Sequence, residues 1–290
     1  MDMPVSRRGD TEPKGKLVAI GGAEDKTSDA EVLRRVLELT GKSRPRVGVI
    51  TTASGYPDEV FADYQQVFGR IGAGAVLDIR VRERTDAEAP EVIEMIQGSD
   101  VIFISGGDQM RLTSIFGGSS ALEALRQRHL EGGVIAGTSA GAACQSTTMV
   151  YGGDATDSLR KGAVKMTAGF GFIERVIIDT HFLERGRFSR LMEVGATNPE
   201  YLGVGLGEDA GALFEDGMLH AFGPGHVILV DSSEISGSNV FDLEEGEAVS
   251  LYNVKMHALV DGDVYSLDDR SVLKPEDIAA KDTEEHNADS

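Results

Sequence analysis

The chain has 290 residues, of which 41% are apolar, a size at which one α/β domain can enclose a single core. Its formal net charge of −20 argues against unspecific binding to nucleic acid, because the phosphates would be repelled. No apolar run approaches the length of about 18 residues that crosses a bilayer, so we expect no membrane partner.

The cysteine content and the first residues indicate in which cellular compartment the protein is expected. Cys144 is the only cysteine, which excludes an internal disulfide framework and a multi-cysteine zinc site. No apolar segment follows the basic residues Arg7 and Arg8, which favours a cytoplasmic protein without a secretory signal. The acidity is typical of a solubilising surface or a salt-rich habitat, and it would also suit a cationic or amphoteric substrate.

The two ends of the chain differ in composition from the rest. Residues 1–14 are polar and contain two prolines, and residues 274–290 are acidic and lack aromatic side chains. Both segments therefore predict disorder, as an N-terminal arm and an acidic tail. Residues 15–273 are predicted to form a single α/β domain.

Strands and helices alternate along the first two thirds of that domain. Short apolar runs bounded by Gly, Thr or Ser predict strands buried on both faces, at 17–20, 47–50, 75–79, 101–104 and 134–136. Helical patterns lie between and after them, at 29–39, 58–71, 87–96, 121–130 and in a segment that opens at Ala140. This alternation predicts a mostly parallel sheet wrapped by helices, with functional residues at the carboxyl ends of the strands.

After about residue 200 the pattern changes to short apolar pieces separated by glycines. Two turn sequences, Glu215-Asp216-Gly217 and Asp261-Gly262-Asp263, lie between such pieces. Turns of this kind between alternating residues predict added C-terminal β-hairpins.

The sequence Gly137-Thr138-Ser139-Ala140-Gly141 follows a buried strand and opens a segment of small residues. This is the context of a nucleophile elbow, in which Ser139 attacks and the amide of Ala140 stabilises an oxyanion. The segment Ser105-Gly106-Gly107-Asp108 could supply a second amide, and we expect it to be that of Gly107. The alternatives are a closely packed turn with Ser139 as a helix N-cap, and a plain turn at Gly107.

A serine hydroxyl needs a base, and His181 is the preferred one because it follows the apolar strand 176–180. The other histidines are less suitable: His129 on a charged helix face, His257 in a hairpin strand, His220 and His226 beside a turn, and His286 in the tail. Glu208 follows the apolar run 204–207 and is preferred over Asp209 as the orienting acid. The chain order Ser, His, acid differs from the order Ser, acid, His of α/β-hydrolases.

Three arginines, Arg185, Arg187 and Arg190, follow the proposed base within six positions. Guanidinium groups bind carboxylates in a bidentate manner, which favours an aspartate-rich substrate, whereas the alternative is a solvated helix start. Asp179 shares a strand face with His181, where it would hold either substrate or structure.

Five blocks in order resemble the motif series of the cyanophycinases over residues 15–270: Gly21-Gly22-Ala23-Glu24-Asp25-Lys26, Gly106-Gly107-Asp108-Gln109, the serine elbow, Asp179-Thr180-His181-Phe182 with the three arginines, and Gly205-Leu206-Gly207-Glu208. Cyanophycinases share a peptidase family with the aspartyl dipeptidase peptidase E. In fold they resemble class I glutamine amidotransferases, which are flavodoxin-like.

The resemblance implies exo-hydrolysis of cyanophycin, a poly-aspartate with arginine on each β-carboxyl, to β-Asp-Arg dipeptides through an acyl-enzyme on Ser139. His181 would be the base and Glu208 its orienting acid. Gln109, Asp179, Thr180 and the three arginines would contact substrate, with Thr180 standing where the family often has Gln. The resemblance implies a homodimer and no metal or organic cofactor.

Three other functions remain open at this point. A peptidase E-like dipeptidase would use the same triad on small Asp-X peptides. A binding module on an amidotransferase-like scaffold would keep the elbow without its reaction. An α/β-hydrolase esterase would take its histidine from beyond the acid, at His220, His226 or His257.

Overall fold

The computed structural model describes residues 15–154, 156 and 159–274. The predicted N-terminal arm lies outside the described residues, as does the predicted tail except for Lys274. No helix in the described part of the chain is long and apolar enough to cross a membrane.

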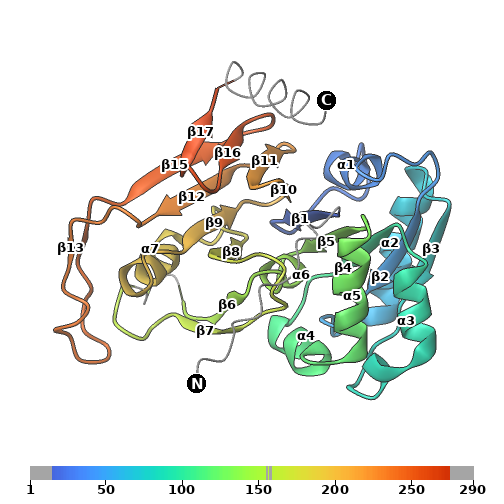
Figure 1. Cartoon of the computed structure of the whole chain (residues 1–290), viewed down its shortest axis with the longest axis horizontal. Coiled ribbons are helices and arrows are strands. Elements are labelled where there is room, and N and C mark those ends of the chain that lie inside the picture. Colours follow the sequence, from blue (N-terminus) through green and yellow to red (C-terminus); the bar gives the residue numbers. More distant parts are fainter. Residues whose placement is uncertain (1–14, 155, 157–158, 275–290) are drawn as a thin grey trace, which may run out of the picture.

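A nine-stranded sheet forms the centre of the molecule (Figure 1). In spatial order its strands are β17 (Ser271–Leu273), β16 (Val264–Ser266), β11 (Met218–Phe222), β10 (Gly211–Glu215), β1 (Lys16–Ile20), β5 (Val134–Thr138), β4 (Val101–Ile104), β2 (Arg46–Ile50) and β3 (Ala75–Asp78). From β1 to β3 all neighbours are parallel, whereas β10, β11, β16 and β17 pair antiparallel. The sheet is therefore mixed rather than mostly parallel.

Alternate residues of the parallel strands face two separate cores, as the period of two in a strand requires. Val18 and Ile20 of β1 pack with α1 (Glu31–Glu38) and α2 (Pro57–Arg70) on one face. Leu17 and Ala19 face the other core, which includes α3 (Pro90–Gln97), α4 (Gln109–Phe116) and α5 (Ser120–Leu130). Helices thus cover both faces of the parallel part of the sheet.

A second, four-stranded sheet lies beside the first and was not expected from the sequence. Its order is β15 (Lys255–Leu259), β12 (Val227–Asp231), β9 (Leu202–Leu206) and β8 (Val176–Thr180). Strands β8 and β9 are parallel, and α7 (Phe188–Thr197) packs against this sheet at the end of the molecule away from α3 and α5 (Figure 1). Two short ladders, β6 (Thr148–Gly152) with β7 (Lys165–Ala168) and β13 (Gly237–Ser238) with β14 (Leu251–Tyr252), complete the described strands.

Several local predictions differ from the structure. The helix expected at 87–96 is a 3₁₀ turn, η1 (Asp86–Glu88), followed by α3, because Pro90 starts a new helix. Helix α6 (Ala140–Ala143) is a single turn, and strand β3 is only half-buried because it lies at the edge of the sheet.

The two predicted turns have different roles. The Asp216-Gly217 turn, with both residues at positive φ, joins β10 to its antiparallel neighbour β11. The Asp261-Gly262-Asp263 turn instead leads from β15 in the second sheet to β16 in the first. The strands on either side of it do not pair, so the hairpin predicted there is wrong.

His129 lies in the core and not on the charged helix face predicted for it. Only 7% of the residue is exposed, and its ring packs edge-on against Phe172. Burial lowers the pKa of His129 from 6.5 to about 4, because the charged imidazolium is disfavoured away from water.

This burial predicts an acid-dependent loss of stability. In the unfolded chain His129 binds a proton below pH 6.5, whereas in the folded chain it does so only below about pH 4. The free energy of unfolding is therefore highest above pH 6.5 and decreases as the pH falls toward 4. Between pH 7 and pH 5 we expect His129 to account for about 2 kcal/mol of lost unfolding free energy. Urea unfolding at both pH values should show a smaller loss in His129→Phe, and an unchanged loss in the exposed control His226→Gln; equal losses in all three proteins would contradict the prediction.

Candidate active site

Ser139 occupies the sharp turn between β5 and α6. Its backbone has φ 52° and ψ −112°, a positive φ that a non-glycine residue rarely adopts. A Cβ atom at Gly137 would overlap the carbonyl of Gly141, and one at Gly141 would overlap the carbonyl of Ile104. The two glycines are therefore required by space, and they allow the serine to stand at the end of the strand.

Hydrogen bonds connect Ser139, His181 and Glu208 in series. The Oγ of Ser139 lies 3.1 Å from Nε2 of His181, and Nδ1 of His181 lies 2.7 Å from Oε1 of Glu208. The imidazole can therefore accept the serine proton at Nε2 while the carboxylate fixes its orientation through Nδ1. Asp209, the alternative acid, instead accepts a hydrogen bond from the amide of Asp25.

The two halves of this arrangement come from different sheets. Ser139 follows β5 of the nine-stranded sheet, whereas His181 and Glu208 follow the parallel neighbours β8 and β9 of the four-stranded sheet. The sequence predicted strand ends for all three residues, but it did not predict that two sheets would contribute them.

The turn after β1 joins these elements. Ile20 and Gly21 accept hydrogen bonds from the amides of Ser139 (2.9 Å) and His181 (2.8 Å), and Gly22 accepts one from Asp209 (2.9 Å). Gly22 has φ 103°, and a Cβ there would overlap the His181 ring. Glycine at this position lets the imidazole approach the backbone closely.

The two predicted oxyanion donors, the amides of Gly107 and Ala140, belong to residues that line the same cavity as Ser139. Gly107 has φ 139°, and a Cβ there would overlap the carbonyl of Ala53. Within the described residues neither amide takes part in a hydrogen bond. Both remain able to donate to a developing oxyanion.

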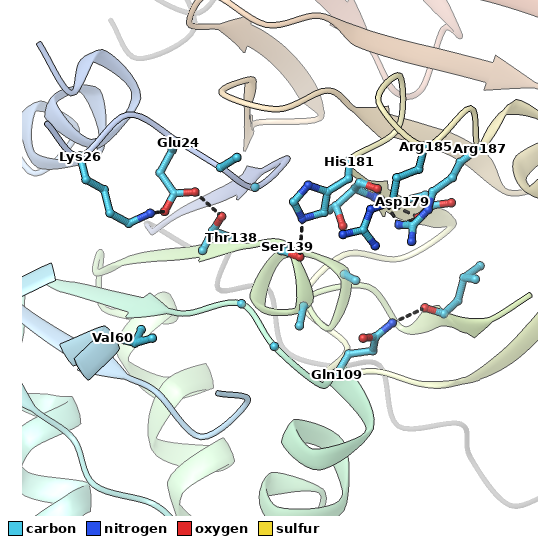
Figure 2. A pocket seen from close by; sticks show the side chains of 18 of the residues that line it. Glu24, Lys26, Val60, Gln109, Thr138, Ser139, Asp179, His181, Arg185 and Arg187 are labelled. Atoms are coloured by element: carbon cyan, nitrogen blue, oxygen red, sulfur yellow. Dashed lines mark hydrogen bonds and ion pairs between the residues drawn. The ribbon is translucent and has the colours of Figure 1, made fainter. Parts of the chain in front are cut away.

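Ser139 lies between the two ends of a cavity of about 450 Å³ (Figure 2). Gln109, Arg185 and Arg187 are at one end, and Lys26, Glu24 and Val60 are at the other. Thr180 also lines the cavity, and the Gln109 side chain donates to the carbonyl of Val150 at 3.2 Å. Of the residues predicted to contact substrate, the structure therefore brings all but Arg190 to the cavity: Gln109, Asp179, Thr180, Arg185 and Arg187.

Arg190 differs from that prediction, because it is 5% exposed and does not line the cavity. Its Nε lies 2.9 Å from Oδ2 of Asp179, and its Nη1 donates to the carbonyl of Gly153. Arg187 contacts the other oxygen of Asp179 at 3.0 Å and donates to the carbonyl of Thr180 at 2.6 Å. Asp179 borders the cavity, but its carboxylate is engaged by the two arginines.

Burial and the ion pairs have opposite effects on the pKa values of Asp179 and Arg187. Asp179 is 3% exposed, and burial raises its pKa while Arg190 and Arg187 oppose the rise. Burial likewise lowers the pKa of Arg187, and Asp179 opposes that change. The carboxylate thus stabilises two guanidinium groups, one of which faces the cavity.

Removing this carboxylate is predicted to destabilise the protein, because it leaves two guanidinium groups, the buried one of Arg190 and the half-buried one of Arg187, without their partner. We expect Asp179→Ala to lower the free energy of unfolding by about 3–5 kcal/mol. Asp216→Asn, in an exposed turn, should change it by less than about 0.5 kcal/mol. Denaturant unfolding of both variants measures this, and similar values would show that the buried ion pairs contribute little.

Glu24, Lys26, Asp63 and Tyr64 also line the cavity, and none was singled out from the sequence as a site residue. Glu24 and Lys26 belong to the motif block that begins at Gly21-Gly22, so this motif could have indicated that they lie near Ser139. The presence of Asp63 and Tyr64 depends on how α2 packs, which no pattern in the sequence predicts.

Within the described residues, no group of three or more His, Cys, Asp or Glu side chains is arranged to hold a metal ion. His220, His226 and His257, which an α/β-hydrolase would need, are not among the residues that line the cavity.

The hydrogen-bonded Ser, His and Glu at a strand-to-helix turn have the geometry of a serine hydrolase. Residues 17–222 match the model of Peptidase family S51, and the chain belongs to this family of serine peptidases. The chain is 37% identical to a cyanophycinase of Synechococcus elongatus over 256 residues, which is 88% of this chain and 80% of the relative. It is 36% identical to a cyanophycinase of Trichormus variabilis over 263 residues, covering 90% of this chain and 88% of the relative.

A solved structure has a similar fold. The crystal structure of a peptidase from an acI-B1 Actinobacterium superposes with a TM-score of 0.67 and 22% identity, covering 87% of this chain and 96% of that one. The match to Peptidase family S51 and the identity to the two cyanophycinases confirm, at the level of the family, the resemblance found in the sequence motifs.

Proposed function

We propose that the protein is a serine exopeptidase that hydrolyses cyanophycin to β-Asp-Arg dipeptides. The observation that carries the proposal is the Ser139–His181–Glu208 series of hydrogen bonds beside a cavity that contains Arg185 and Arg187. The identity to cyanophycinases over most of both chains supports the choice of polymer.

In the proposed reaction, Nε2 of His181 takes the proton of the Ser139 hydroxyl as Oγ attacks the scissile carbonyl. The amides of Ala140 and Gly107 stabilise the oxyanion. The imidazolium then protonates the leaving amine, the peptide C–N bond breaks and an ester forms on Ser139. His181 next deprotonates a water molecule that hydrolyses this ester, and the proton returns to Ser139.

Arg185 and Arg187 suit the acidic part of the substrate. Arg185 is exposed at the cavity and has no ion pair with another described residue, so its guanidinium can receive a substrate carboxylate. Arg187 is held by Asp179 with one Nη group and still lines the cavity. In this proposal Gln109 and Thr180 contact the substrate, whereas Asp179 and Arg190 position Arg187.

We extend the proposal to the assembly and fold type on the strength of the family resemblance. The protein is proposed to be a cytoplasmic homodimer that needs no cofactor, with a class I glutamine amidotransferase-like scaffold. The order β3-β2-β4-β5 supports a flavodoxin-like core, in which β1 takes the place of the fifth strand.

A clearing assay on insoluble cyanophycin tests the substrate. The wild-type protein should clear the polymer and release β-Asp-Arg, and Ser139→Ala should reduce the rate by at least about 10³-fold because the nucleophile is absent. Turnover of small Asp-X dipeptides without clearing would favour the peptidase E-like function. Absence of labelling of Ser139 by a fluorophosphonate in the folded protein would favour a binding module.

The identity of the orienting acid can be tested with a matched pair of variants. Glu208→Gln should lower kcat by about 10³–10⁴-fold, because an amide no longer stabilises the imidazolium. Asp209→Asn keeps an oxygen for the Asp25 amide and tolerates the φ of 53°, so kcat should stay within a few-fold of wild type. If Asp209→Asn lowered kcat more than Glu208→Gln, Asp209 would be the acid that orients His181.

A further inference from the structure

At the end of the cavity opposite to Arg185 and Arg187, Glu24 is buried and paired with Lys26, which leaves Lys26 and the carboxylate of Asp63 as the charged groups that a ligand can reach (Figure 2 labels Glu24 and Lys26). We propose that these two side chains form a subsite for an arginyl group of the substrate, with Lys26 receiving its α-carboxylate and Asp63 its guanidinium. The proposal rests on the proposed function and adds a determinant of substrate choice to it.

The ammonium of Lys26 is held in place by its neighbours. Its Nζ lies 2.9 Å from Oε1 of Glu24 and 5.0 Å from the centre of the Tyr64 ring. An ammonium group has three donors, of which this contact with Glu24 uses one. Because 30% of the Lys26 side chain is exposed at the cavity, further donors can reach a ligand.

Glu24 can hold Lys26 in one position because the carboxylate of Glu24 is itself held by hydrogen bonds. It is 4% exposed and accepts hydrogen bonds from the Tyr64 hydroxyl at 2.5 Å and the Thr138 hydroxyl at 2.6 Å. Thr138 immediately precedes Ser139, so Glu24 connects Lys26 to the turn that carries the nucleophile. The distance from the proposed nucleophile to this subsite is therefore set by buried contacts.

Asp63 belongs to the face of α2 that borders the cavity. It follows Val60 by three residues and precedes Tyr64, and all three line the cavity. Asp63 is exposed, and its carboxylate forms no hydrogen bond or ion pair with another described residue. Burial and the charge of Glu24 raise the pKa of Tyr64, and the charge of Asp63 contributes in the same direction.

This arrangement complements the chemistry of cyanophycin. Each arginine is joined to a β-carboxyl through its α-amino group, so it keeps a free α-carboxylate and a free guanidinium. Lys26 and Asp63 match these two charges, whereas a poly-aspartate chain without arginine offers no cation for Asp63. The subsite would thus select the arginylated polymer over plain aspartyl peptides.

Calorimetric binding to inactive Ser139→Ala protein tests the subsite with an intact ligand. The ligands are a soluble β-Asp-Arg tetramer and tetra-aspartate of the same backbone length. In this background Lys26→Met and Asp63→Asn should each raise the Kd of the arginylated tetramer about tenfold, and they should change the Kd of tetra-aspartate less than twofold. Lys26→Arg should retain most of the affinity because it keeps the charge.

Matched controls are Lys165→Met on β7 and Glu59→Gln on α2, two exposed residues that do not line the cavity and that should leave both Kd values unchanged. Thermal unfolding of each variant verifies that it is folded. Unchanged binding of the arginylated tetramer by both variants, or an equal loss for both ligands, would overturn the subsite.

Wild-type cleavage of the same tetramer separates this proposal from the one on which it rests. Cleavage together with unchanged Kd values in the variants removes the subsite and leaves the function. Selective loss of binding without wild-type cleavage removes the reaction and leaves a site for an arginyl group.

Discussion

The close approach of four backbone segments at the end of β1 is the constraint on which the site depends. A Cβ at Gly21 would overlap the carbonyl of Gly207, and one at Gly22 would overlap the imidazole of His181. Since the same turn accepts the amides of His181 and Asp209, it holds β8 and β9 of the second sheet against the first. The hydrogen-bond distances between Ser139, His181 and Glu208 are therefore consequences of how tightly two sheets pack around two glycines.

Buried carboxylates on either side of the serine extend this rigidity into the cavity. Asp179 holds Arg187 at one end, and Glu24 holds Lys26 at the other while also accepting a hydrogen bond from Thr138 beside Ser139. Each carboxylate is almost fully buried and offers its oxygens to several donors, which is how a buried charge is compensated. Cations that would be mobile at a surface are thus positioned relative to Ser139.

Sequence patterns predicted the parts of this site that follow local rules. The run from β5 into α6 and the strand ends before His181 and Glu208 were visible as apolar segments followed by polar residues, and the glycines two positions before and after Ser139 have the spatial reason expected. The second sheet was not predictable, because β8 and β9 have the same buried pattern as the strands of the first sheet. The role of Arg190 was missed for a related reason: its spacing from Arg187 indicates a helix start but not which side becomes buried.

The charge of the chain is also easier to interpret once the cavity is located. A net charge of −20 predicts general repulsion of polyanions, yet the cavity has Arg185 and Arg187 at one end and Lys26 at the other, and Asp63 also lines it. A substrate that carries carboxylates and guanidinium groups in equal number would be little repelled by the surface, and each of its charges could meet an opposite one inside. A plain polyanion would meet the same arginines only after crossing an acidic surface. The bulk acidity and the local basic groups therefore act in the same direction, since both favour a substrate in which positive and negative charges alternate.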